Sequence, residues 1–586
     1  MKFIKRNAAP RSAWALEQAG VHPLLAQLFA SRGVQQPDEL DDQLARLLPP
    51  SQLLHANTAA QLLANAMEQN HPVCVVADYD CDGATACAVA LRGLRLLQAA
   101  VATARQQAPR PDLFRFLVPD RVTDGYGLTA PIAQRVKTTG AQVLMTVDNG
   151  IASLEGVQAA RELGMDVLVT DHHLPAVVNG QVVLPADCTI VNPNQPGCPF
   201  ESKAMAGVGV VFYVLLALRA ELRERGVFTT ATQPKIDSLL PLAALGTVAD
   251  VVRLDANNRR LVAQGLKRIR AGALPPGLAA LFAVAARQPQ RASSFDLGFA
   301  LGPRLNAAGR LSDMTLGIEC LTTDDPARAD ELARALDAIN RERKTIEGDM
   351  REQALQLADE MLDDSAEPPP ALVLFDPDFH EGVVGIVASR IKDRLHRPTF
   401  VFAMSQAEGH EDELKGSGRS IPGFHLRDAL DLVAKRCPGV LRRFGGHAMA
   451  AGCTIDADRL DEFEAALQQI AHNGLDAATL TRKLETDGPL DKTFRRIDVV
   501  DLLQGPVWGQ GFPPPLFAEE VEVVGQRLVA DKHLALKLKH QGEPIDAMWF
   551  HHTEPLPAKA TLAFRLEADE WQGQRRLRFL VEGMAG

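Results

Sequence analysis

The stretch "VCVVADYDCDG" (residues 73–83) joins an apolar, β-branched run to three aspartates at alternate positions and a glycine. Val73–Ala77 has the composition of a short buried strand, and the residues that follow Gly83, "ATACAVALRGLRLL", have that of a helix. Three crowded carboxylates repel one another at neutral pH, so a compact loop that contains them is expected to bind cations as well. The stretch predicts a strand–loop–helix unit with an acidic cation site.

A calcium-binding EF-hand loop is the first alternative for these aspartates. Its first six positions match Asp78, Asp80, Asp82 and Gly83, but its twelfth, which requires a bidentate glutamate, is Val89. The loop also follows a predicted strand, whereas an EF-hand loop follows a helix. Both mismatches exclude the EF-hand and favour a catalytic divalent-metal site.

The composition sets broad limits on the class of protein. A chain of 586 residues with 46% hydrophobic residues is expected to form two to four globular domains. No long uncharged apolar run predicts a membrane span, the N-terminus lacks the features of a signal peptide, and the eight scattered cysteines suit reduced thiols. We therefore expect a cytoplasmic protein with no membrane association. The net charge of −11 means that a nucleic-acid ligand would need a local basic groove.

The pattern along the chain predicts an α/β protein with an additional all-β domain. Apolar β-rich runs alternate with helical stretches in the first half, as in a parallel sheet covered by helices, and short alternating strands follow residue 475. The predicted parts are an N-terminal helical segment (1–55), a parallel-sheet domain (56–326), a long connecting helix (327–365), a smaller α/β domain (366–472) and a β barrel or sandwich (473–586). "SAEPPP" (365–370) is the clearest linker.

Polar residues follow three further apolar runs of the first domain. Asp148 follows "QVLMTV", Asp171 with His172 and His173 follows "MDVLVT", and Asp250 follows "LAALGTVA". The carboxyl ends of parallel strands share one edge of a sheet, where ligands bind. Each residue alone has an ordinary alternative: a helix N-cap, a turn at "DNG", or a hydrogen-bonded histidine pair. Together they favour a cluster of oxygen and imidazole ligands for Mn²⁺ or Mg²⁺.

Such a cluster predicts phosphate chemistry. Two divalent ions about 3.5–4 Å apart can clamp a phosphate between an attacking hydroxide and the leaving oxygen. The expected reaction is phosphoryl hydrolysis without a covalent intermediate.

The motifs "DYDCDG", "VDNG", "TDHH" and "GTVADVV", in this order, resemble those of the DHH phosphoesterase superfamily, and "GHAMAAG" (446–452) resembles the signature of its companion DHHA1 domain. "VPDRVTDGYGL" (118–128), "GPRLNAAGRL" (302–311) and "EGVVGIVASRI" (381–391) narrow the resemblance to the single-stranded-DNA-specific exonucleases of that superfamily. The match covers roughly residues 60–455. The C-terminal β region agrees in position with an OB-fold that binds nucleic acid.

The resemblance implies a 5′→3′ exonuclease that hydrolyses single-stranded DNA with two Mn²⁺ or Mg²⁺ ions in recombination and repair. It also implies a single-strand-binding protein and a helicase as partners. Carried over to this sequence, the resemblance makes Asp80 and Asp82 metal ligands, with Asp78 as a ligand or supporting acid. Asp148 bridges the two ions, and His172 and Asp250 complete the second site. Asp171 orients a neighbouring residue, and His173 contacts the scissile phosphate. Many smaller relatives have a histidine where this chain has Val76, which leaves the role of Asp78 open.

The same resemblance suggests contacts for DNA. In the first domain the candidates are Arg121, Tyr126, Arg304, Asn306 and Arg310. In the second domain Ser417 and Arg419 lie on a predicted flexible loop, where they would bind a terminal 5′ phosphate. His447 is expected to approach the cleft that contains this phosphate. For the arginines a structural ion pair is the alternative, and for His447 a buried structural role. In the OB-like region the candidates are Lys537, Lys539, Trp549, Trp571, Arg575, Arg576 and Arg578, with burial in the barrel core as the alternative for the tryptophans.

Two other functions stay open at this point. One is a DHH phosphodiesterase that acts on short oligonucleotides, and the other is a non-catalytic scaffold that binds single-stranded DNA. The OB-like region argues against the first, because a small substrate needs no platform. All the expected acidic positions are filled, which argues against the second.

Overall fold

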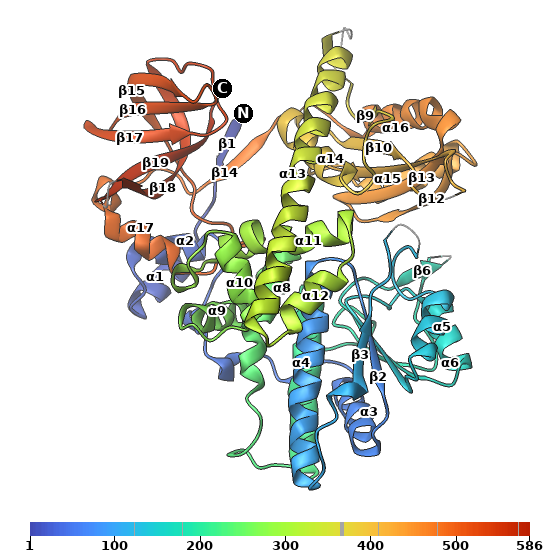
Figure 1. Ribbon diagram of the computed structural model, residues 1–586. Helices are drawn as coiled ribbons and strands as arrows, with labels where there is room; N and C mark the ends of the chain where they lie inside the picture. The colour runs from blue at the N-terminus through green and yellow to red at the C-terminus, as the bar shows by residue number, and fades with distance from the viewer. Residues whose placement is uncertain (122–123, 179, 364–368, 408, 478, 572–573) are drawn as a thin grey trace.

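A five-stranded parallel sheet underlies the first half of the chain in the computed structural model (Figure 1). The structure describes residues 1–121, 124–178, 180–363, 369–407, 409–477, 479–571 and 574–586. The strand order is β3-β2-β4-β5-β8, and all pairs are parallel. The strands are β2 (Val73–Ala77), β3 (Phe114–Leu117), β4 (Val143–Val147), β5 (Asp166–Thr170) and β8 (Thr189–Val191). The fold class predicted from the sequence is confirmed.

Helices cover both faces of this sheet, and the alternation along β2 shows how. Val73, Val75 and Ala77 point into a core shared with one set of helices, and Cys74 and Val76 point into a second core on the other face. This two-sided burial explains the continuous apolar runs. The first set includes α3 (Ala56–Gln69), α4 (Cys81–Ala104) and α7 (Gly207–Glu224), and the second is α5 (Ala130–Thr138) and α6 (Leu154–Glu162).

The register of the sheet aligns the strand ends that matter for function. Ala77 of β2 is the partner of Val147 of β4, which is the partner of Thr170 of β5. The residue after each is an aspartate, so three carboxylates emerge at the same edge. Beside this sheet the chain continues as a helical layer: α8 (Leu240–Ala249), α9 (Ala256–Arg270), α10 (Pro276–Val284), the π-helical turn η7 (Asp296–Leu301), α11 (Gly302–Leu311) and α12 (Thr315–Thr322).

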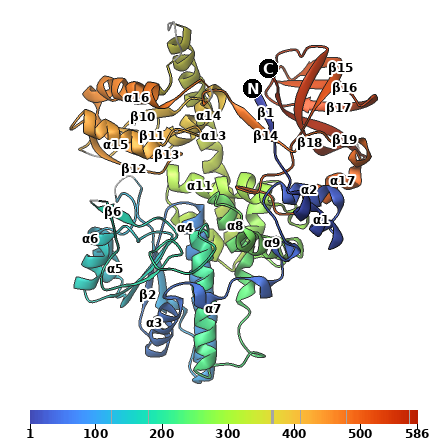
Figure 2. The same ribbon diagram turned by 180° about the vertical axis from the view of Figure 1, so that it is seen from behind.

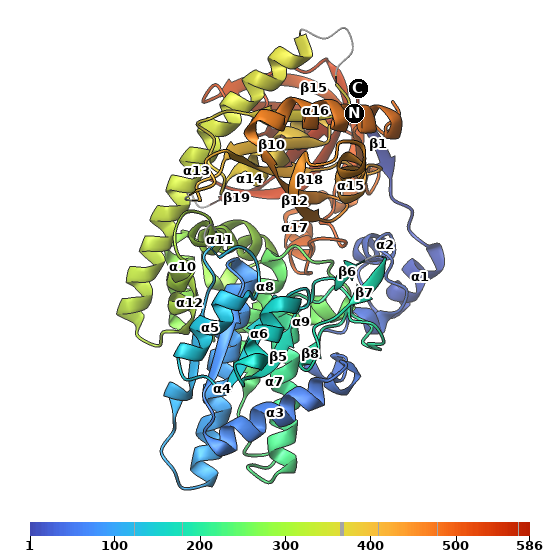
Figure 3. The same ribbon diagram turned by 90° about the vertical axis from the view of Figure 1, so that its right-hand side faces the viewer.

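Helix α13 (Pro326–Asp363) runs past both α/β units (Figure 3). Its first half packs on α10, α11 and α12, and its second half packs on α14 and β9. At 38 residues it is about 57 Å long. The predicted linker after it falls largely on residues 364–368, outside the described residues.

The second α/β unit is a mixed sheet with the order β12-β13-β11-β10-β9. Its cores lie on two faces, one with α15 and α16 and the other with α14 and the end of α13. The elements are β9 (Leu372–Phe375), α14 (Val384–Leu395), β10 (Thr399–Met404), β11 (Glu413–Arg419), α15 (Leu426–Arg436), β12 (Leu441–Gly446), β13 (Ala450–Asp456) and α16 (Leu460–Gly474).

The prediction that Ser417 and Arg419 lie on a flexible loop, "GSGRS" (416–420), is wrong, because residues 413–419 form β11 in the middle of this sheet. The glycines are there for close packing. A Cβ at Gly416 would lie 2.2 Å from the ring of Phe402, and one at Gly418 would lie 2.5 Å from the ring of Phe400. Ser417 and Arg419 therefore project from a rigid strand.

A closed barrel ends the chain, with the order β15-β16-β17-β19-β18. Its strands are β15 (Phe517–Val529), β16 (His533–His540), β17 (Glu543–Trp549), β18 (Lys559–Trp571) and β19 (Gln574–Met584), and α17 (Ile497–Gln504) packs on β18 and β19. The barrel alternative of the sequence prediction is confirmed.

The N-terminal segment contains a strand that the sequence did not predict. Besides α1 (Pro10–Gln18) and α2 (Pro23–Ala30), it forms β1 (Lys2–Lys5), which pairs in parallel with β14 (Lys483–Thr486) beside the barrel (Figure 2). Four mostly exposed residues carry little pattern, and their partner lies about 480 residues away, so the pairing is invisible to local sequence analysis.

Among the described helices, α4 is long and apolar enough to cross a membrane by length and composition. However, 72% of that apolar window is buried inside the protein, where α4 packs on α7 and α8. Its apolar character is accounted for by its central position in the core.

A buried ion pair fastens the N-terminal helices to the segment that enters the barrel. Arg32 donates 2.9 Å hydrogen bonds to both carboxylate oxygens of Asp487, and the side chains are only 1% and 3% exposed. We expect Arg32→Ala to lower the free energy of unfolding by about 3 kcal/mol, because it removes two hydrogen bonds from a buried carboxylate and leaves the more distant Arg6, at 3.5 Å, as its cationic partner. Arg46→Ala removes an exposed pair with Asp41 and should cost less than about 1 kcal/mol. Denaturation followed by circular dichroism tests this, and equal effects of the two substitutions would contradict it.

Candidate active site

The acidic loop places three carboxylates between β2 and α4. Asp80 is the N-cap of α4, where its Oδ1 accepts a hydrogen bond from the Gly83 N–H at 2.9 Å. Asp82 lies in the first turn and is buried. Its two oxygens accept hydrogen bonds from the backbone N–H groups of Gly207 (2.6 Å) and Val208 (2.9 Å) at the start of α7. The positive end of a second helix thus fixes one carboxylate of the loop.

Asp148 lies at the centre of the site and comes directly after β4. Its φ of 64° is unusual for a residue with a side chain, and the following Asn149 fixes the turn by donating to the carbonyls of Val76 and Val147. The sequence analysis gave a simple turn at "DNG" as the alternative to a metal ligand. In the structure the segment forms that turn and also places Asp148 in the site. A Cβ at Gly207 would lie 2.5 Å from the Asp148 Oδ1, so only glycine fits there.

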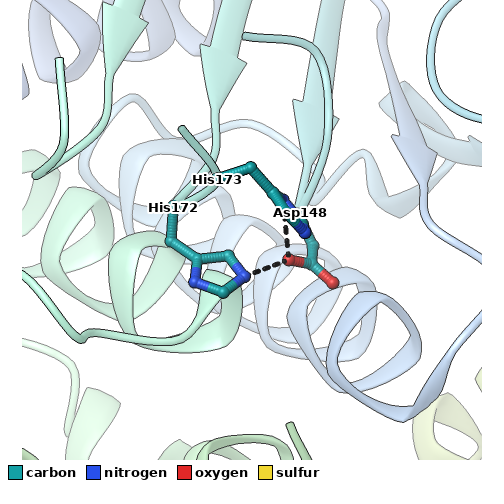
Figure 4. A group of neighbouring side chains, drawn as sticks. All are labelled: Asp148, His172 and His173. Atoms are coloured by element: carbon teal, nitrogen blue, oxygen red, sulfur yellow. Dashed lines mark ion pairs between the residues drawn. The ribbon is translucent and has the colours of Figure 1, made fainter. Parts of the chain in front are cut away.

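Two histidines after β5 face this aspartate (Figure 4). The Nε2 of His172 lies 3.1 Å from the Asp148 Oδ1, and the Nδ1 of His173 lies 4.0 Å from the same oxygen. Asp171 holds both histidines: its Oδ1 accepts from the N–H groups of His172 (2.7 Å) and His173 (3.0 Å) and lies 2.8 Å from the His173 Nδ1. This contact set supports the orienting role inferred for Asp171.

Asp250 joins the site by a different route from the one predicted. The sequence analysis placed it at a strand end, but it is the C-cap residue of α8. The run before it is apolar because α8 is a buried helix, and an apolar run of this length does not distinguish a strand from a buried helix. Its Oδ2 lies 3.5 Å from the His172 Nε2, so the predicted proximity holds although the element was wrong.

The side chains form overlapping groups of donor atoms that could hold metal ions. In each group the donor atoms lie within 4.8 Å of one another. The groups are Asp78 with Asp80 and Asp148; Asp82 with His172 and Asp250; and Asp148 with His172 and His173. Asp148 belongs to two of them, which is the arrangement expected of a bridging ligand.

Unpartnered buried atoms show that this donor set fits divalent cations. The Oδ1 of Asp148, the Nε2 of His172 and the Oδ2 of Asp250 are buried without a hydrogen-bond partner. Such atoms are costly unless something binds them. Carboxylate oxygens with one imidazole suit Mn²⁺ and Mg²⁺. Val76 is buried in β2, and Asp78 lies in the group with Asp80 and Asp148, where it can supply the ligand that Val76 does not.

Burial and mutual repulsion raise the pKa values of the clustered carboxyl groups. Burial and the charge of Asp80 raise the pKa of Asp82 to about 7. Burial, and then the charges of Asp82 and Asp80, raise the pKa of Asp148 and that of Asp250 well above the usual value. Burial and the charge of Asp80 do the same for Asp78. Without cations these groups cannot all ionise at neutral pH.

The adjacent histidines are shifted in opposite directions. Burial and the charge of His173 lower the pKa of His172 to about 4, so its imidazole is neutral at pH 7. Burial opposes protonation of His173 too, but the hydrogen bond to Asp171 and the charge of that carboxylate raise its pKa to about 9. Burial opposes ionisation of Asp171, yet His173 holds its pKa below the usual value.

Basic residues gather next to the acidic loop. The Nη1 of Arg310 donates to the Gly382 carbonyl at 3.2 Å, and burial followed by the charges of Arg121 and Arg419 lowers its pKa to about 10. Arg419 donates a 3.0 Å hydrogen bond to the hydroxyl of Ser417. Within the described chain neither Arg310 nor Arg419 forms an ion pair with a carboxylate. This cluster of cations is suited to an anion.

The side chains of Ser417 and Arg419 pack so closely on α14 that position 385 has no room for a side chain. A Cβ at Gly385 would lie 2.9 Å from both the Ser417 Oγ and the Arg419 Nη2. Gly385 lies in the first turn of α14, where free backbone N–H groups favour anions.

Other predicted DNA contacts have structural partners. Arg304 lies 2.9 Å from Asp337 on α13, the ion-pair alternative left open by the sequence. Asn306 accepts a hydrogen bond from the Cys81 N–H at 2.7 Å and so anchors the acidic loop.

Two further candidates lie beside His173. The Tyr126 hydroxyl lies 3.4 Å from both ring nitrogens of His173. His447, in the turn between β12 and β13, has a pKa lowered by burial and by the charge of His173.

The barrel candidates are mostly paired as well. Trp549 stacks on His552 with ring centroids 3.7 Å apart. It is partly buried against the core, which is the alternative to DNA binding that the sequence analysis gave for the tryptophans. Arg575 pairs with Asp501, Arg578 with Glu567 and Asp569, and Lys539 with Glu522. Lys537 and Arg576 form no ion pair within the described part of the chain, and the side chain of Trp571 lies outside the described residues.

Sequence reasoning missed Gly207 and Val208. Their backbone N–H groups hold Asp82, and the space at Gly207 admits Asp148. The signal was the run of small residues in "AMAGVGVV" (204–211) at the start of a helix, which has no distinctive spacing.

Comparison with known proteins agrees with this arrangement. Family models match in chain order: the DHH family N-terminal domain over residues 72–247, the DHHA1 domain over 369–473 and the RecJ OB domain over 486–583.

Curated relatives named single-stranded-DNA-specific exonuclease RecJ cover nearly the whole chain, and two of them illustrate the similarity. The one from Salmonella typhimurium is 43% identical, over 96% of each chain. The one from Escherichia coli strain K12 is 42% identical, over 97% of this chain and 96% of its own.

Solved structures agree. RecJ from Thermus thermophilus in complex with Mn²⁺ is similar over 100% of this chain and 79% of its own, with a TM-score of 0.80 and 28% identity. An exonuclease RecJ bound to manganese covers 73% of this chain and 96% of its own, with a TM-score of 0.58 and 32% identity. With relatives this similar over nearly its full length, and with the acidic, histidine and basic groups in place, the chain belongs to the RecJ family of single-stranded-DNA-specific exonucleases in the DHH superfamily.

Proposed function

We propose that the chain removes nucleotides from the 5′ end of single-stranded DNA by hydrolysing phosphodiester bonds with two divalent cations, Mn²⁺ or Mg²⁺. The observation that carries the proposal is the shared position of Asp148 between groups of buried donor atoms. Two RecJ structures from Thermus thermophilus contain Mn²⁺ and Mg²⁺, respectively.

The proposed ligands follow from the donor groups. Asp78, Asp80 and Asp148 would hold one cation, and Asp82, His172 and Asp250, with Asp148 as the bridge, would hold the other. When bound, such a pair supplies Lewis acidity, which polarises a phosphodiester and lowers the pKa of water. The neutral imidazole of His172 is in the protonation state that a ligand needs.

His173 has a separate role. Because Asp171 keeps it protonated at neutral pH, it can donate a hydrogen bond to a non-bridging oxygen of the scissile phosphate and offset its negative charge. Asp171 acts through His173 as a positioning residue, and its 3.0 Å contact with the Ile151 N–H keeps the carboxylate in place. Neighbouring groups with opposite pKa shifts are a common sign of divided roles.

The basic cluster accounts for the polarity. Arg419, Ser417, Arg310 and the start of α14 would bind a terminal 5′ phosphate. A chain end held beside the metal ligands places the first phosphodiester bond at the cations. His447, Ser417 and Arg419 come from the second α/β unit, so the substrate would pass between the two units, which suits a single strand.

The remaining parts of the proposal concern cellular context. The OB barrel would bind the strand upstream, with Lys537 and Arg576, which form no ion pair within the described residues, among the candidate contacts. A single-strand-binding protein and a helicase as partners, a role in recombination and repair, and a cytoplasmic location are proposed from the family resemblance. The exact domain boundaries, at residues 55, 326, 365 and 472, also stay predictions.

Digestion of end-labelled strands tests the whole proposal. A single strand blocked at its 3′ end should be degraded with Mn²⁺ or Mg²⁺ and left intact with EDTA, whereas a 5′-blocked strand should resist. Faster cleavage of a dinucleotide than of a 30-mer would favour the short-oligonucleotide alternative. Binding without cleavage under every condition would favour the scaffold.

Asp148→Asn should lower kcat by at least about 10²-fold while single-strand binding persists, because it removes the shared ligand. In EDTA the variant should melt no lower than the wild type, since one crowded charge is gone, and the rise in Tm caused by Mn²⁺ should shrink. Asp112→Asn, at an exposed carboxylate paired with Arg110, is the matched control. An unchanged response to Mn²⁺ would remove Asp148 from the metal site.

In EDTA the stability of the protein should fall as the pH rises from about 4 to about 7. The pKa of Asp82 is about 7 in the folded chain and has a reference value of 3.8. Asp78, Asp148 and Asp250 also have raised pKa values. These four carboxyl groups retain protons that the unfolded state has lost, and they outnumber His172, whose lowered pKa acts in the opposite direction. Raising the pH in this window therefore favours unfolding. Saturating Mn²⁺ should reduce this slope. Differential scanning calorimetry across the window, with and without Mn²⁺, measures it, and identical slopes would contradict the prediction.

Arg419→Ala should raise KM for a 5′-phosphorylated strand by about 10-fold or more, because it removes charge-assisted hydrogen bonds, and should leave a 5′-hydroxyl strand almost unaffected. Arg436→Ala, at an exposed position of α15, is the control. Equal effects on both strands would mean that Arg419 does not read the terminal phosphate.

A further inference from the structure

The buried stripe along helix α13 is apolar at both ends and polar in the middle. Residues three or four positions apart form this stripe, which packs on the first α/β unit and then on the second. Its apolar members include Leu332, Ala333, Leu336, Met350, Ala354 and Ala358. Between them the stripe contains Asn340, Arg343 and Glu347, which are only 1%, 8% and 8% exposed. Apolar residues of similar volume often stabilise a protein as well as a buried ion pair does, so stability alone does not explain these polar residues.

The three polar side chains bind one another. Arg343 donates one hydrogen bond to the Glu347 carboxylate and another, of 3.1 Å, to the Asn340 Oδ1. The second carboxylate oxygen of Glu347 accepts a hydrogen bond from the Nε of Arg390 on α14 at 3.1 Å. The Arg390 side chain is 57% exposed, whereas that of Arg343 is 9% exposed, and water weakens exposed ion pairs. Arg343 is therefore the main counter-charge of this carboxylate.

Helix α11 packs on α13 (Figure 1). Near the start of α11, Arg304 lies 2.9 Å from Asp337 of α13. At the end of α11, Leu311 packs in the apolar core that contains Met350 of α13. The two helices thus run in the same direction, and the end of α11 lies close to residues 343–347.

The end of α11 carries Arg310. This side chain donates a hydrogen bond to the Gly382 carbonyl at 3.2 Å, and within the described residues it forms no ion pair. Burial lowers the pKa of Arg310, and the charges of Arg121, Arg419 and Arg343 add to this effect. Arg310 thus lies near a positive charge on α13, and its own charge is available to a ligand.

We propose that Arg343 is a positioning residue that keeps Arg310 available to the terminal 5′ phosphate by neutralising Glu347. The inference rests on the proposed function, in which Arg310 belongs to the phosphate site. If position 343 were neutral, Glu347 would remain as a buried carboxylate about 6 Å further along α13. A guanidinium and a carboxylate form strong charge-assisted hydrogen bonds, so Arg310 would turn to Glu347 and leave the phosphate with one cation fewer.

Neutralising the two charges of α13 singly and together tests the inference. The readout is the ratio of kcat/KM for a 5′-phosphorylated single strand to that for the same strand with a 5′ hydroxyl, because this ratio does not depend on the amount of folded enzyme. Arg343→Gln should lower the ratio by about 10-fold, as expected from the loss of charge-assisted hydrogen bonds to the phosphate. Glu347→Gln and the double variant should both stay within about 3-fold of the wild-type ratio, because no carboxylate then competes for Arg310.

Two further variants serve as controls. Arg334→Gln removes a 73% exposed arginine of the same helix, which pairs with Asp330, and should keep the wild-type ratio. Arg343→Lys retains the positive charge beside Glu347 and should keep a ratio close to that of the wild type. If Arg343→Gln does not fold, Glu347→Gln decides by itself. A network that only joins α13 to α14 would lose the preference for the phosphate with this substitution too, and that result would overturn the inference.

The outcomes separate the inference from the proposed function. If the wild type cleaves both strands with equal kcat/KM, the proposed phosphate site fails and the inference fails with it. If the wild type prefers the phosphorylated strand and Arg343→Gln keeps that preference, Arg343 does not act on Arg310, although the exonuclease function stands. If the double variant shows as low a ratio as Arg343→Gln, the loss does not come from Glu347 and the inference is overturned.

Discussion

Repulsion among buried carboxylates is the constraint on which the rest of this structure depends. Asp78, Asp82, Asp148 and Asp250 are brought together in a largely buried site, and one oxygen of Asp148 and one of Asp250 have no hydrogen-bond donor there. The free energy to assemble them comes from the two apolar cores of the parallel sheet, which are large enough to hold an unfavourable centre in place. The site is therefore prepared for cations before they arrive.

The scaffold fixes the site with backbone groups more than with other side chains. Asp82 is held by the N-terminus of α7, Asp80 caps α4, and Asp171 accepts from three backbone N–H groups. Backbone donors at helix ends and turns cannot rotate away as side chains can, so these acids keep their orientation. The strained backbone of Asp148 fits the same description, since the turn around it is tied to β2 and β4.

How far the sequence predicted this structure depended on whether the signal was local. The parallel sheet and the convergence of Asp78, Asp148 and Asp171 were predictable, because strand ends in a parallel sheet share an edge. The helix that carries Asp250 was not, since a buried helix and a buried strand are both short apolar runs. The strand at residues 413–419 was missed because its glycines are required by close packing against Phe400 and Phe402 on a neighbouring strand, which local sequence does not reveal. The partners of Arg304 and Asn306 also lie far away in sequence.

Helix α13 acts as a rigid spacer between the two α/β units, so it sets both the distance between them and their rotation about the helix axis. Its first half belongs to the unit with the metal ligands, and its second half belongs to the unit with Ser417 and Arg419. One residue inserted in its middle would turn the second unit by about 100° and shift it by about 1.5 Å along the axis. The length and rotation of α13 thereby set the distance between the bound 5′ end of the DNA and the bond that is cut. Evolution can retune the surfaces of either unit freely, but it can change this spacing only in whole steps of the helix.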